Sequence, residues 1–128
     1  MTHRSRLSGF IIDCQVDDLG AAADFWVQAL GCSVADRDAG DGTSEYQMLG
    51  DTPGDLHIEV QKVVHASRVH LDIESDDVDA EASRLVALGA KKIAFVKRWW
   101  LMEAPSGQRF CVVKMKYPER GTPAKAWD

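Results

Sequence analysis

The chain repeats itself at an interval of 59 residues. Each copy contains a strand-like stretch followed by an amphipathic helix, and a residue number in the first copy plus 59 gives its counterpart in the second. The identical pairs are Asp13/Asp72, Asp17/Asp76, Asp18/Asp77, Ala21/Ala80, Ala23/Ala82 and Val27/Val86. Two unrelated amphipathic helices would not be expected to share three aspartates in register. A fixed offset indicates a duplicated unit, and the order of its elements predicts βαβββ taken twice.

The first copy predicts one strand, one helix and three short strands. Residues 1–7 are expected to be a frayed start, and residues 9–16 alternate in polarity as a strand does. Asp17 and Asp18 can cap a helix over 19–30, which Gly31 ends. Phe25 and Trp26 on that helix are expected in the core. Further strands are predicted at 32–37, 45–49 and 56–63, and the Gly-, Asp- and Pro-rich segments between them favour turns.

The second copy begins with a strand over 68–75 that has one apolar and one polar face. Val69, Leu71 and Ile73 are expected to lie under the following helix, whereas the polar face carries the residues Arg68, His70, Asp72 and Glu74. The apolar stripe of the predicted helix is Val78, Ala82, Leu85 and Leu88, and the segment DAEASR at 79–84 is interpreted as exposed helix surface. Strands follow at 91–96, 99–104 and 108–116, and residues 117–128 are expected to be a polar tail.

Composition restricts the class of protein. The 128 residues suit one domain, and no apolar run approaches the roughly 18 residues of a membrane span. We expect a cytoplasmic protein, because no secretory signal is visible at the start. The three cysteines are an odd number without a paired motif, which favours free thiols. The net charge of −5 argues against nucleic acid as a partner.

Charge is distributed unevenly along the chain. Residues 1–90 contain 6 Lys/Arg against 17 Asp/Glu, whereas residues 91–128 contain 9 against 3. This asymmetry is compatible with attraction between the two ends of the fold or with an anionic ligand near the last strands.

Three motifs, IIDCQVDDLGAAADFWVQALG at 11–31, VHLDIESDDVDAEASRLVALGA at 69–90 and LMEAPSGQRFCV at 101–112, resemble the vicinal-oxygen-chelate superfamily and its glyoxalase-like branch. The resemblance implies one α+β domain over 1–128, with unit one at about 8–63, unit two at about 68–116 and a tail at 117–128. Each unit would curl a mixed sheet around a concave cleft with its helix outside, and two chains would form a homodimer. Fold analogy alone assigns no activity.

The polar strand faces are expected to line that cleft. The residues concerned are Asp13, Gln15, His57, Glu59, Gln61, Arg68, His70, Asp72, Arg109 and Cys111. Trp99 and Trp100 are adjacent on a strand, so one would point inward, where stacking on a flat ligand and core filling are both open. Asp13 and Asp72 could each act as a general base, or form ion pairs with Arg68 and Arg109.

Metal-dependent members of the superfamily carry ligands at positions that correspond here to Ile11, Glu59, His70 and Cys111. Glu59 and His70 suit a divalent Zn, Ni, Fe or Mn ion, Ile11 cannot bind metal, and Cys111 replaces the usual carboxylate. Asp13 and Asp72 could supply further ligands, and His57 a third one. The other possibility is a metal-free cleft in which these groups bond to one another.

Two functional hypotheses follow from the resemblance. In the first, the protein is a lyase or isomerase for a small oxygen-bearing and anionic molecule. Glu59, His70 and Asp13 would be catalytic, while His57, Gln61, Arg68, Asp72, Trp99, Trp100, Arg109 and Cys111 would bind the substrate. In the second, the protein is a metal-free binder that sequesters a small molecule, as resistance proteins of this superfamily do.

Overall fold

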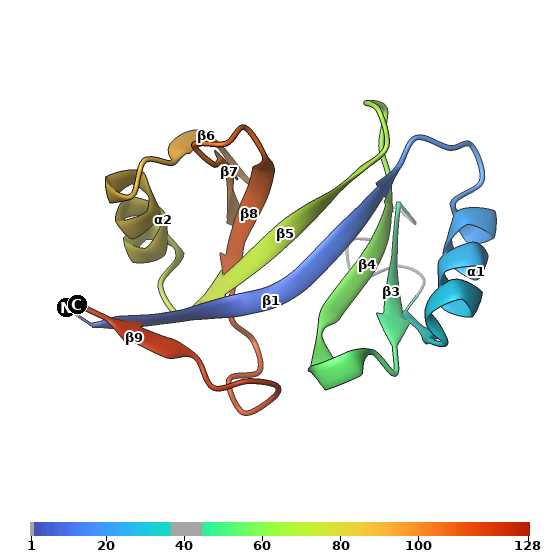
Figure 1. Cartoon of the computed structure of the whole chain (residues 1–128), viewed down its shortest axis with the longest axis horizontal. Coiled ribbons are helices and arrows are strands. Elements are labelled where there is room, and N and C mark those ends of the chain that lie inside the picture. Colours follow the sequence, from blue (N-terminus) through green and yellow to red (C-terminus); the bar gives the residue numbers. More distant parts are fainter. Residues whose placement is uncertain (1, 37–44) are drawn as a thin grey trace. The chain divides into compact units, whose positions relative to one another are not determined.

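The computed structural model describes residues 2–36 and 45–128 (Figure 1). Within these residues, the chain divides into two compact units. The N-terminal unit comprises residues 10–69, and the C-terminal unit combines residues 1–9 with 70–128. Strands β1 (His3–Cys14) and β5 (Arg68–Ser75) each contribute residues to both units.

The N-terminal unit has the predicted element order. After β1 come α1 (Leu19–Leu30), β2 (Ser33–Asp36), β3 (Tyr46–Gly50), a short 3-10 helix η1 (Pro53–Asp55) and β4 (His57–Lys62). The strand order is β2-β3-β4-β1, and β3 runs antiparallel to both β2 and β4. Arg37 and the Asp- and Gly-rich segment 38–44, predicted as a strand end and a turn, lie outside the described residues.

The C-terminal unit repeats this arrangement. After β5 come α2 (Val78–Ala87), β6 (Lys91–Val96), β7 (Trp99–Glu103), β8 (Arg109–Lys114) and β9 (Lys125–Trp127). The strand order β5-β8-β7-β6 matches β1-β4-β3-β2, which confirms the predicted α+β repeat. Strand β8 pairs parallel to β5 and antiparallel to β7, so the sheet is mixed.

Equivalent residues begin the two helices. The carboxylate of Asp18 accepts a hydrogen bond from the backbone N–H of Ala21 at 3.2 Å, and that of Asp77 accepts one from Ala80 at 3.0 Å. Each bond satisfies an N–H that has no partner within its helix. The caps are therefore the same two residues of the repeat, 59 positions apart.

Each unit buries one face of its sheet under its own helix. In the N-terminal unit the buried cluster is Ile12, Cys14, Leu19, Ala23, Leu49, Ile58 and Val60. In the C-terminal unit it is Ala82, Ala90, Met102, Phe110 and Val112. Within the described part of the chain, no helix is long and apolar enough to cross a membrane.

The apolar face of β5 is less covered than predicted. Ile73 packs against the C-terminal core, but Val69 and Leu71 are 58% and 51% exposed. The prediction that all three lie under a helix is therefore wrong. The reason is that α2 packs against β6, β7 and β8, so its apolar side covers only the end of β5.

Two apolar helix residues also lie outside the cores. Phe25 is 61% exposed and meets Trp26 edge to face, while Trp26 itself packs on the N-terminal core. Leu88 is exposed at the C-terminal cap of α2, so it does not belong to the predicted apolar stripe. The prediction of core positions is wrong for Phe25 and Leu88, and confirmed for Trp26.

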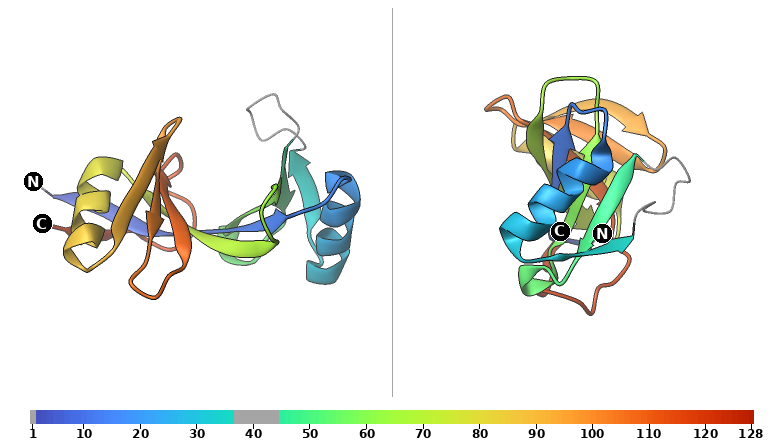
Figure 2. Two further views of the ribbon diagram at one scale, coloured as in Figure 1. Left: turned by 90° about the horizontal axis from the view of Figure 1, so that it is seen from above. Right: turned by 90° about the vertical axis from the view of Figure 1, so that its right-hand side faces the viewer.

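The expected frayed start and polar tail pair with each other. Strand β1 begins at His3, and its residues His3, Arg4 and Ser5 lie opposite Trp127, Ala126 and Lys125 of β9 (Figures 1 and 2). The guanidinium of Arg6 donates hydrogen bonds to the backbone carbonyls of residues 117, 118 and 122. Both expectations were based on polar composition, which does not reveal pairing between residues more than 120 positions apart.

A buried ionic cluster joins this strand pair to α2. Glu81 has no exposed surface, and its carboxylate accepts hydrogen bonds from Nε and a terminal nitrogen of Arg84 at 2.8 and 2.9 Å. Nε2 of His3 lies 2.8 Å from the same carboxylate. The ring of Trp127 stacks on Arg84, and its indole N–H donates to Ser5. The interpretation of 79–84 as helix surface alone is thus wrong for Glu81.

Candidate functional site

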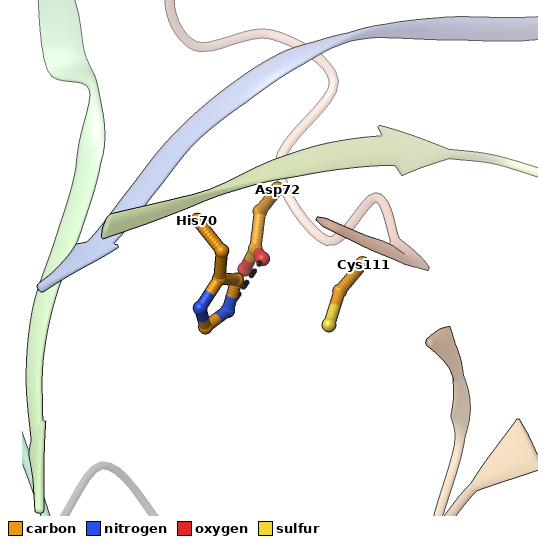
Figure 3. Close-up of side chains that lie close together, drawn as sticks. All are labelled: His70, Asp72 and Cys111. Carbon is orange, nitrogen blue, oxygen red and sulfur yellow. Dashed lines mark ion pairs between the residues drawn. The ribbon is translucent and has the colours of Figure 1, made fainter. Parts of the chain in front are cut away.

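Three side chains with metal-binding atoms meet on the face of β5 and β8 opposite the core. His70 and Asp72 are two residues apart on β5 and so share a face, and Cys111 of β8 lies opposite Asp72 in the parallel register. Figure 3 shows the three side chains pointing toward one another. One donor atom from each lies within 4.8 Å of the other two, and Nε2 of His70 is 3.6 Å from Oδ1 of Asp72.

The cluster fits a divalent transition metal in donor type. Imidazole nitrogen, carboxylate oxygen and cysteine sulfur are the ligands that zinc uses in proteins. In a tetrahedral site such donors are roughly 3.3 to 3.6 Å apart, by the usual metal–ligand distances. The His70–Asp72 pair already has that spacing, and Cys111 needs only a small side-chain movement. Three protein ligands also leave a fourth position for water or substrate.

This set differs from the one that the family resemblance implied. His70 and Cys111 belong to both sets, and Asp72 replaces Glu59 as the third ligand within the C-terminal unit. Ile11, at the fourth implied position, is buried and apolar. Sequence reasoning ranked Asp72 below Glu59, although its place two residues after His70 on one strand face was the signal that could have promoted it.

The N-terminal unit holds a second group of polar side chains. On β4, Nε2 of His57 lies 2.6 Å from a carboxylate oxygen of Glu59, and both side chains are partly shielded from water. Gln61 donates a hydrogen bond to the hydroxyl of Tyr46 on β3 at 3.0 Å. The sequence analysis missed Tyr46, which lies opposite Gln61 in the strand register.

The buried carboxylate of Asp13 faces an arginine. Asp13 is 2% exposed, and its Oδ2 lies 3.8 Å from Nε of Arg68, whose side chain is about half exposed. The ion pair is one of the two roles that the sequence left open for Asp13. Arg109 pairs with Glu103 on the neighbouring strand at 3.1 Å, so it has a different carboxylate from the one expected. Gln15 donates to the backbone carbonyl of Val64.

A cavity of about 430 Å³ lies beside this ion pair. It is bounded by α1, the end of β1 and residues 67–69, and most of its lining is apolar. Phe25 and Trp26 form its aromatic wall. Burial and the adjacent charge of Asp13 raise the pKa of the Cys14 thiol, so this cysteine on the cavity wall stays protonated near neutral pH.

The two adjacent tryptophans have different surroundings. Trp100 packs on the C-terminal core, meets Phe95 edge to face and donates its indole N–H to Asp79 at 2.9 Å. It fills the core, which is one of the roles left open by the sequence. Trp99 is half-buried, with the ammonium of Lys97 6.0 Å from the centre of its ring.

Comparison with known proteins agrees with this architecture. The model of the family described as "Glyoxalase-like domain" matches residues 9–113. No protein with a curated description matches the chain in sequence.

Several solved structures share the fold at low sequence identity. A methylmalonyl-CoA epimerase from Mycobacterium tuberculosis is 16% identical with a TM-score of 0.62, over 86% of this chain and 87% of that one. A hypothetical protein from Bacillus halodurans is 12% identical with a TM-score of 0.64, over 88% and 95%. A glyoxalase/bleomycin resistance protein/dioxygenase superfamily member from Vibrio splendidus is 15% identical with a TM-score of 0.55, over 87% and 99%. The matched family model and the duplicated βαβββ units together show that this chain belongs to the glyoxalase-like domain family of the vicinal-oxygen-chelate superfamily.

Proposed function

We propose that this protein is a glyoxalase-like enzyme, a lyase or isomerase that acts on a small oxygen-bearing and anionic organic molecule. The observation that supports this is the cluster of His70, Asp72 and Cys111, in which three different metal-binding groups converge on one sheet face. Structural ion pairs do not need a thiol and an imidazole beside the same carboxylate. We therefore propose that these residues hold one divalent metal ion.

The chemistry proposed for the site is stabilisation of negative charge on a substrate oxygen. A divalent metal held there would polarise that oxygen as a Lewis acid. Asp72 lies beside the His70 ring and can keep it oriented toward the site. We further propose that Glu59, which His57 contacts at 2.6 Å, and the buried Asp13 act as proton-transferring groups.

Metal analysis tests the proposed centre directly. Protein purified without chelator should contain about one equivalent of a transition metal, and His70→Ala should lose it while keeping the circular dichroism spectrum of the fold. The matched control is His65→Ala, because His65 is exposed in the loop after β4. Wild-type protein that is folded and takes up no added Zn²⁺, Ni²⁺, Fe²⁺ or Mn²⁺ would contradict the proposed centre.

The reaction class needs its own experiment. A lyase or isomerase that stabilises an enolate-like intermediate should exchange the hydrogen next to a substrate carbonyl with deuterium from the solvent. Proton NMR in D₂O with a panel of small carbonyl acids should reveal this exchange, and His70→Ala should abolish it. Exchange at the same rate in wild type and His70→Ala would remove His70 from the chemistry.

The cavity beside Asp13 supports a second candidate, a metal-free binding protein. Its aromatic wall and its volume of about 430 Å³ suit a small apolar ligand. A compound that raises the melting temperature of metal-free protein would support binding without chemistry, especially if Trp26→Ala removed the effect. The homodimer expected from the family resemblance stays a prediction, which light scattering can check.

A further inference from the structure

We propose that Cys111 makes the metal centre selective for sulfur-preferring ions such as Zn²⁺ and Co²⁺, against the oxygen-preferring Mg²⁺ and Mn²⁺. This inference rests on the proposed function, because it concerns the ion that the same three residues would hold. It goes beyond that proposal by assigning the choice of metal to one atom, the sulfur of Cys111.

The position of this sulfur is set by its strand. Phe110 and Val112, on either side of Cys111, are buried in the C-terminal core under α2. Neighbouring residues of a strand point to opposite faces, so Cys111 has to point away from that core. Turning the sulfur out of the site would expose two core side chains, which makes an alternative orientation of β8 unfavourable. The pairing of Cys111 with Asp72 then brings the thiol beside the carboxylate.

The chemistry of the three donors favours soft ions. A thiolate binds zinc, cobalt and similar metals well, whereas Mg²⁺ and Mn²⁺ prefer carboxylates, carbonyls and water. Asp72 is the only oxygen donor of the three residues, so an oxygen-preferring ion would have to accept a sulfur and a nitrogen as its other protein ligands. A carboxylate in place of Cys111 would give a more oxygen-rich site and should weaken the discrimination.

The other two cysteines provide internal controls. Cys14 is part of the N-terminal core and Cys32 lies just after α1. Among the described residues, the cluster of His70, Asp72 and Cys111 is the one group in which a cysteine joins other potential ligands. A spectroscopic signal from metal-bound sulfur would therefore be assigned to Cys111, and Cys32→Ser is the variant that should leave it unchanged.

Cobalt titration is the test. Metal-free wild-type protein should bind one Co²⁺ and develop the near-ultraviolet absorption of a cobalt–thiolate bond. Cys111→Asp should still bind Co²⁺ without that absorption, and its preference for Zn²⁺ over Mn²⁺ in competition should fall by roughly tenfold or more. Cys32→Ser should behave like wild type in both measurements.

The outcomes separate this inference from the proposed function. Co²⁺ bound to wild type without the thiolate absorption, or an unchanged Zn²⁺/Mn²⁺ preference in Cys111→Asp, would overturn the role of Cys111 and leave a metal centre standing. Folded wild-type protein that binds neither Co²⁺ nor Zn²⁺ would overturn both. If Cys111→Asp does not fold by circular dichroism, Cys111→Ser gives the same comparison, because it removes the sulfur with little change in volume.

Discussion

The buried carboxylate of Glu81 should be a major contributor to stability. The substitution Glu81→Gln keeps the side-chain volume and removes the charge that Arg84 and His3 contact. Breaking a buried ion pair from one side costs about 3 to 5 kcal/mol. The Arg84 side chain keeps 25% of its exposure, so water can partly compensate and about 3 kcal/mol is expected. For a chain of this size, that corresponds to a melting temperature lower by roughly 10 °C.

The effect of Glu81 should depend on pH in a defined direction. Burial by itself raises the pKa of this carboxyl, but hydrogen bonds from Arg84, His3 and Ser5 outweigh it and hold the pKa below its usual value of 4.5. A pKa that is lower in the folded protein contributes stability above the unfolded value, and this stability is lost as pH falls through the folded value. The gap between wild type and Glu81→Gln should therefore be full near neutral pH and shrink in acid.

Thermal unfolding followed by circular dichroism at several pH values measures both effects. Glu119→Gln is the matched control, because Glu119 is exposed and its substitution should change the melting temperature by a degree or two at most. A Glu81→Gln variant that melts with the control near neutral pH would refute the energetic role of the cluster. A gap that stays constant into acid would refute its electrostatic origin.

Two further predictions concern the strand pair at the ends and the helix caps. Trp127→Ala removes the stacking on Arg84 and the hydrogen bond to Ser5, so it should cost about 2 kcal/mol and speed hydrogen exchange at residues 3–5; unchanged exchange would show that β9 is held in another way. Asp18→Ala and Asp77→Ala should each cost about 1 kcal/mol in urea unfolding, because they remove equivalent capping bonds. A cost from only one of them would contradict the equivalence.

The parts of the fold that were predictable are those with local or periodic signals. The offset of 59 residues, the aspartate caps and the alternation of β4 and β5 all act over a few residues, and the structure confirms the helices at the predicted places. The pairing of β1 with β9 has no such signal. His3 to Ser5 are polar in sequence and become strand only because residues at the other end of the chain satisfy their backbone.

Burial was harder to predict than secondary structure. Glu81 lies in a charged helical segment, and only the contacts with Arg84 and His3 explain why a carboxylate can be buried there. Leu71 follows the same alternation as Ile73, but its exposure depends on where α2 packs. At the site, the periodicity of β5 placed His70 and Asp72 on one face, whereas their neighbour Cys111 depended on the register of a parallel strand pair.

The division of β1 between the two units has a consequence for how the protein is made. Residues 10–69 leave the ribosome as one uninterrupted block, whereas residues 1–9 belong to a unit whose last strand is synthesised more than 110 residues later. The first segment to emerge is therefore among the last to find its partners, and such long-range closure slows folding. Until translation ends, His3 and Ser5 are without the neighbours that bury them in the finished protein, which makes the nascent N-terminus the stretch most open to proteases and chaperones.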